Sequence, residues 1–81
     1  MKIGYEKLPT VYARLVDMAG RTVGRIPVGK VFGQYDPGTR SVKIDPALNP
    51  ALNDPERPLL EKYMKLPTEE AVIAHEATHH T

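Results

Sequence analysis

The sequence predicts an α+β fold in one small domain that spans residues 1–81. Three observations support this prediction: apolar stripes with helical spacing occur near both ends, strand-like alternation lies between them, and eight prolines and six glycines divide the chain into short elements. The chain contains no cysteine, so no disulfide can stabilise its small core. A bound metal ion or a partner chain would therefore contribute more to stability than it does in a larger domain.

The first expected element is an N-terminal helix over residues 8–19. Its apolar residues recur at the i, i+3, i+4, i+7 and i+8 positions of one helical face, namely Leu8, Val11, Tyr12, Leu15 and Val16. Pro9 suits the first turn of a helix, and Gly20 suits the position just after the last turn.

The middle of the chain has the composition of strands. A first short strand is expected at residues 22–28, where Pro27 confines it to a sheet edge or a strand end. A β-hairpin is expected at residues 31–45, because "VFGQY" and "RSVKI" flank the turn sequence "DPGT". Val42 and Ile44 alternate with polar residues, so one face of this strand should be buried in a short antiparallel sheet.

Two further helices are expected in the second half of the chain. Asp54 can cap a helix near residues 55–66. The buried side of that helix would consist of Leu59, Leu60, Tyr63 and Met64. Thr68 can cap a C-terminal helix over residues 69–81, and the glutamates of its first turn complement the helix dipole.

The C-terminal helix carries the sequence "HEATH" at residues 75–79. His75 and His79 are one helical turn apart, so they lie about 6 Å from each other on the same face. Two imidazoles placed in this way can each bring a nitrogen to about 2.0–2.1 Å from one Zn²⁺. The carboxylate of Glu76 can then accept a proton from a water molecule beside the ion without binding the ion itself.

The segment "VIAHEATHH" resembles the signature of the zincin (HExxH) zinc metallopeptidases, and the order of small sheet and motif helix is similar to small members of the ImmA/IrrE and minigluzincin kind. The resemblance implies Zn²⁺ as the cofactor, His75 and His79 as its ligands, and Glu76 as the general base. It also implies a peptide or protein substrate that pairs with an edge strand, expected at residues 40–45.

The chain departs from the zincin pattern after the motif. Zincins take a third protein ligand from the following sequence, and here only His80 and Thr81 follow. His80 lies about 140° around the helix from His75. It can therefore bind the metal as an additional ligand, or contact one of the metal ligands, only if the last turn frays. Asp45 and Glu61 are the upstream alternatives. We therefore expect the N-terminal part of a longer metallopeptidase domain, inactive by itself.

Other classes of function stay open. One is a non-catalytic binding or regulatory module, in which a metal ion joins two copies of the chain through paired His75 and His79. Another is a small nucleic-acid-associated protein. Residues 1–45 carry eight basic and four acidic side chains, a net +4, and residues 46–81 carry three and six, a net −3. This separation is too weak to predict a nucleic-acid surface.

The sequence also bears on location. No apolar run approaches the roughly 20 residues of a membrane helix, and the first residues lack the apolar stretch of a secretory signal. A cytoplasmic location is therefore expected, with no membrane partner.

Overall fold

The computed structural model describes residues 1–80, with His80 described by its backbone only. Its strands are β1 (Lys2–Tyr5), β2 (Thr10–Val16), β3 (Thr22–Lys30), β4 (Gly33–Asp36) and β5 (Ser41–Ile44). Its helices are α1 (Arg57–Tyr63) and α2 (Glu69–Ala77), and 3₁₀ turns span Pro46–Leu48, Pro50–Leu52 and Thr78–His80. The fold is α+β, with two helices and two small sheets among the described residues.

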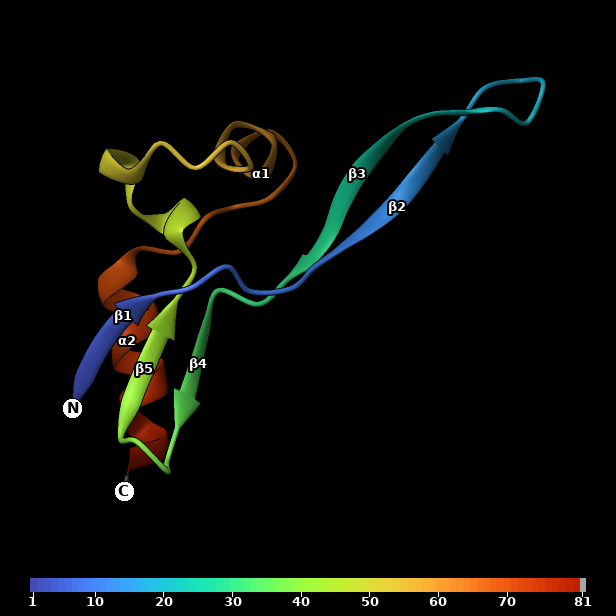
Figure 1. Cartoon of the computed structure of the whole chain (residues 1–81). Helices are drawn as coiled ribbons and strands as arrows, with labels where there is room; N and C mark the ends of the chain where they lie inside the picture. Colours follow the sequence, from blue (N-terminus) through green and yellow to red (C-terminus); the bar gives the residue numbers. More distant parts are fainter. Residues whose placement is uncertain (81) are drawn as a thin grey trace.

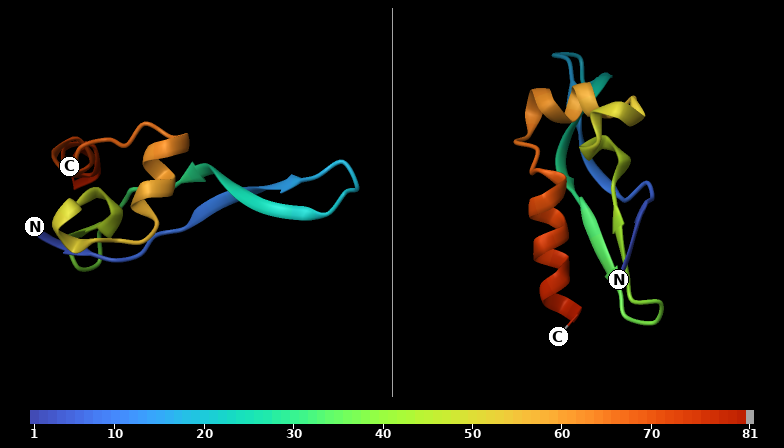
Figure 2. Two further views of the ribbon diagram at one scale, coloured as in Figure 1. Left: turned by 90° about the horizontal axis from the view of Figure 1, so that it is seen from above. Right: turned by 90° about the vertical axis from the view of Figure 1, so that its left-hand side faces the viewer.

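The larger sheet has three strands in the order β1–β5–β4, and α2 packs across one of its faces (Figures 1 and 2). Val42 and Ile44 on β5 are fully buried beneath α2, together with Val72 of the helix and Leu48. Ser41 and Lys43 are only partly buried, so β5 alternates as expected. The β4–β5 hairpin is therefore confirmed.

The expected N-terminal helix is wrong. Residues 10–16 form strand β2, which pairs with β3 in an antiparallel register from Thr10↔Lys30 to Val16↔Thr22. The two strands form an arm that projects from the rest of the molecule (Figure 1). This arm gives the molecule its elongated shape of 51 × 24 × 17 Å.

The turn between β2 and β3 explains why these residues form a hairpin. Asp17 Oδ1 accepts hydrogen bonds from the backbone N–H groups of Ala19 and Arg21, both at 2.9 Å. Gly20 has a φ of 80°, a left-handed conformation that few residues other than glycine adopt readily. A two-stranded ribbon also accommodates the apolar spacing of Val11, Tyr12, Leu15 and Val16. The β-branched side chains of Val11 and Val16 favour strands.

Three further expectations change. The sheet is not wholly antiparallel, because β1 pairs with β5 in a parallel register from Lys2↔Ser41 to Tyr5↔Ile44. Residues 40–45 are not an edge strand, because β5 is central and β4 holds the edge beside α2. The second helix spans only Arg57–Tyr63, and its N-cap, Glu56, makes no side-chain capping bond.

The C-terminal helix is confirmed at its start and shorter than expected at its end. Thr68 is the N-cap of α2, and its side-chain oxygen accepts a hydrogen bond from the Ala71 N–H. The α-helix ends at Ala77 and continues as a 3₁₀ turn over Thr78–His80, while Thr81 lies outside the described residues. Within the described part of the chain, neither helix is long and apolar enough to cross a membrane.

A buried ionic cluster joins the base of the arm to the rest of the molecule. Lys30 Nζ lies 2.6 Å from Asp45 Oδ2 and 2.9 Å from Glu56 Oε1, and it donates to the Leu8 carbonyl at 2.7 Å. Asp45 also accepts from the backbone N–H groups of Leu8 and Ala47, both at 2.9 Å. Each of these buried polar groups has a partner, as a stable interior requires.

Candidate metal centre

The packing of α2 on the sheet decides which of its residues face strand β4. Val72 is buried in the core and contacts the sheet. His75, Glu76 and His79 follow Val72 by three, four and seven residues, so they continue the same stripe along α2 and into the 3₁₀ turn that follows it. The core contact of Val72 therefore places Glu76 against β4, and His75 and His79 lie beside it with exposed side chains.

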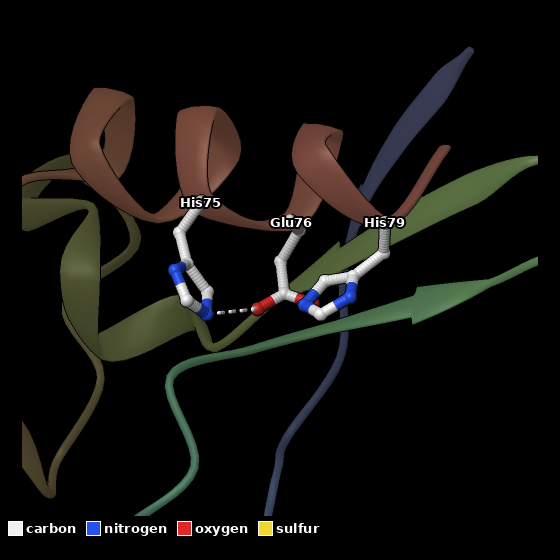
Figure 3. A group of neighbouring side chains, drawn as sticks. All are labelled: His75, Glu76 and His79. Atoms are coloured by element: carbon white, nitrogen blue, oxygen red, sulfur yellow. Dashed lines mark ion pairs between the residues drawn. The ribbon is translucent and has the colours of Figure 1, made fainter. Parts of the chain in front are cut away.

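The structure brings His75, Glu76 and His79 together. One possible ligand atom from each lies within 4.8 Å of the others. His75 Nε2 is 3.9 Å from Glu76 Oε2, and the two imidazole rings meet edge to face with their centroids 5.5 Å apart. Figure 3 shows the three side chains leaving one side of α2, with Glu76 between the imidazoles and β4 running beside them.

These separations suit a metal ion after small side-chain rotations. Ligand atoms placed about 2.1 Å from a tetrahedral zinc ion lie roughly 3.4 Å from one another. The distance of 3.9 Å between His75 Nε2 and Glu76 Oε2 is about 0.5 Å longer than this, and the limit of 4.8 Å for the three ligand atoms is about 1.4 Å longer. His75 is 73% exposed and can rotate freely, whereas Glu76 is only 14% exposed and is held against β4. Rotation of the exposed His75 ring can therefore bring its nitrogen closer to that of His79.

Two open hollows flank the cluster on either side of Glu76. The first, of about 350 Å³, lies beside His75 and has a mainly apolar lining from Val31, Phe32, Pro67, Ala71 and Val72. The second, of about 470 Å³, lies beside His79 and is lined by Gln34, Tyr35 and Pro37. Both hollows are also lined by Val31, Gly33 and Glu76, so they meet where Glu76 crosses β4.

Strand β4 offers backbone groups next to this site. The Asp45 N–H donates to the Phe32 carbonyl at 2.9 Å, just before β4 begins. Hydrogen-bonded and non-hydrogen-bonded pairs alternate along an antiparallel ladder, so the next pair, Gly33↔Ile44, is of the non-hydrogen-bonded kind. The N–H and C=O of Gly33 therefore point away from β5, toward the free edge of the sheet.

The other candidate ligands do not join the cluster. Asp45 is buried in the ionic cluster with Lys30. Glu61 lies on α1 and pairs with Arg57 at 2.7 Å. The side chain of His80 lies outside the described residues. Among the described side chains, the group that could hold a metal consists of His75, Glu76 and His79.

Sequence reasoning missed the contribution of β4 to this site. Gly33 lies beneath Val72 and Glu76, and a glycine inside a strand pattern is a signal of close backbone approach. Phe32 and Pro67 come from segments that are far apart in the sequence, so no local pattern joins them in one hollow. The chain matches no protein-family model, no curated protein and no solved structure.

Proposed function

We propose that this chain carries the metal-binding part of a zinc-dependent peptidase site, with His75 and His79 as ligands and Glu76 as the general base. The observation that carries the proposal is the convergence of the three side chains, with ligand atoms within 4.8 Å, on the side of α2 that faces strand β4. Imidazole nitrogens are common zinc ligands, and a carboxylate beside them is a suitable proton acceptor.

Each side chain has a separate chemical task. A zinc ion bound here would supply a Lewis acid for the peptide carbonyl and would make water more acidic. His75 and His79 hold the ion through one nitrogen each. Glu76 accepts a proton from the attacking water on a carboxylate oxygen and transfers it to the departing amine nitrogen. The largely buried side chain of Glu76 holds its carboxylate between the imidazoles for both transfers.

The surroundings support an extended peptide as the substrate. The backbone groups of Gly33 at the free edge of β4 can pair with a peptide strand, a common mode of recognition at sheet edges. The mainly apolar hollow beside His75 suits an aliphatic or aromatic side chain of that peptide. The hollow beside His79 is lined by Gln34 and Tyr35 and suits a more polar residue.

A metal that bridges two copies of the chain is the second candidate. Two imidazoles fill two positions of a four-coordinate ion, and His75 is 73% exposed. A second His75 and His79 pair can therefore reach the same ion. This arrangement leaves no position for substrate, so it predicts a zinc-dependent dimer without hydrolysis.

Hydrolysis is tested with the zinc-loaded full product of the gene and a mixed peptide library, with cleavage read by mass spectrometry. Glu76→Gln keeps the shape of the side chain and removes the proton acceptor. We expect it to retain zinc and to lower the cleavage rate by about 10²–10⁴-fold, the usual contribution of a general base. Cleavage by Glu76→Gln at the wild-type rate would exclude the proposed role of Glu76.

A further inference from the structure

Strand β4 lies close to α2 at Gly33. A Cβ atom added at Gly33 would lie 2.3 Å from Val72 Cγ1 and 3.3 Å from Glu76 Cγ. The first distance is far below any normal contact between carbon atoms, and the second is also tight. Any side chain at this position would therefore force Val72 to change its rotamer or α2 to move away from β4, and would also press on Glu76.

The need for glycine at this position comes from that contact and not from the backbone conformation. Gly20 is the glycine with a positive φ among the described residues, so the backbone of Gly33 is one that alanine also adopts. Gly4 lies on β1 of the same sheet, and a Cβ atom added there would have no neighbouring heavy atom within 4 Å. The two glycines thus differ in what lies above them, which makes Gly4 a matched control.

We propose that Gly33 is a positioning residue for Glu76: the missing side chain lets α2 lie against β4 and holds the carboxylate between His75 and His79. This inference rests on the proposed function, since it assigns the contact a role in the metal site. His75 and Glu76 lie on α2 and His79 lies in the 3₁₀ turn that continues it. Glu76 packs over Gly33, and its side chain is 14% exposed against 73% for that of His75.

The position of Gly33 also affects the two hollows beside β4. The two hollows that flank Glu76 share Val31, Gly33 and Glu76 in their linings. A methyl group at residue 33 would lie where the hollows meet. Gly33 therefore determines where the Glu76 carboxylate lies and keeps the two hollows connected along the strand.

The test compares the wild-type chain with Gly33→Ala, Gly4→Ala, Glu76→Gln and the double variant Gly33→Ala/Val72→Ala. Co²⁺ alone is the probe, because its visible absorption reports the arrangement of ligands around the ion. Glu76 contacts the water beside the ion and not the ion itself. We therefore expect Glu76→Gln to change the spectrum through that water, Gly33→Ala to change it in the same direction, and Gly4→Ala to leave it unchanged. Val72→Ala removes the methyl group that the new Cβ would meet, so the double variant should recover the wild-type spectrum.

A second readout uses the metal-free chain and NMR resonances of Val72 and Glu76. Gly33→Ala should displace both sets of resonances, and the double variant should return those of Glu76. The inference is overturned if Gly33→Ala matches Gly4→Ala in both measurements. If the wild-type chain takes up no Co²⁺, the proposed function fails, and the metal-free resonances still decide whether Gly33 positions Glu76.

Discussion

Lys30 Nζ lies 2.6 Å from Asp45 Oδ2, and both side chains are completely buried. The pair connects the end of β3 with the segment that follows β5, so it fixes the base of the projecting arm to the three-stranded sheet. A two-stranded ribbon is only marginally stable by itself in water. The ionic cluster around Lys30 is therefore the main polar attachment of the arm.

Removal of the Lys30 charge should destabilise the molecule strongly. Lys30→Met leaves Asp45 and Glu56 without their buried cation, and breaking a buried pair in this way costs about 3 kcal/mol. Urea unfolding followed by circular dichroism measures the change. Lys43→Met is the control, because Lys43 pairs with Glu6 at the surface at 3.0 Å and should cost less than about 1 kcal/mol. Equal losses in the two variants would contradict this prediction.

Glu56 should make stability depend on acid pH. Burial by itself would raise the pKa of its carboxyl, but hydrogen bonds from Tyr12, Lys30, Lys7 and Thr10 outweigh burial and lower the pKa from 4.5 to about 2. The pKa is lower in the folded state than in the unfolded state, so the stabilisation is complete above about pH 4.5 and is lost as the pH falls toward 2.

Urea unfolding between pH 2 and pH 6 checks this dependence. Glu56→Gln should be less stable at pH 6, and its free energy of unfolding should fall less steeply in acid than that of the wild type. Parallel curves for the two proteins would show that another group controls the acid response.

The N-cap of α2 should contribute to the stability of the helix that carries the candidate site. Thr68→Ala removes the oxygen that accepts from the Ala71 N–H at 3.1 Å and should cost about 1 kcal/mol. Thr68→Ser keeps an equivalent hydroxyl and should recover most of this loss. Thermal unfolding distinguishes the variants, and a loss in Thr68→Ser as large as that in Thr68→Ala would argue against the cap.

The elements predicted correctly from the sequence are those with local signals. Thr68 followed by two glutamates marks the start of α2, and "DPGT" between alternating segments marks the β4–β5 hairpin. The stripe over residues 8–19 was ambiguous, because its apolar residues fit a helical face and both faces of a two-stranded ribbon. The decisive signal was Asp17 followed by Gly20, a turn rather than a helix end.

The candidate site was also predictable only in part, because only some of its residues are close together in the sequence. His75, Glu76 and His79 lie within five residues of the segment predicted as one helix, so their spacing alone predicts that they meet. The strand beside them depends on contacts between distant segments. The parallel pairing of β1 with β5 makes β5 central and leaves β4 at the edge of the sheet, and no local pattern indicates that order.

Zinc binding measured by isothermal titration calorimetry on the chain and three variants tests the central claim most directly. We expect one zinc ion per chain, an affinity lowered by at least about tenfold in His75→Ala and in His79→Ala, and no change in His80→Ala. One zinc ion per two chains would indicate the bridged dimer instead. Absence of zinc binding, or equal binding by His75→Ala and the wild type, would contradict a metal centre on α2.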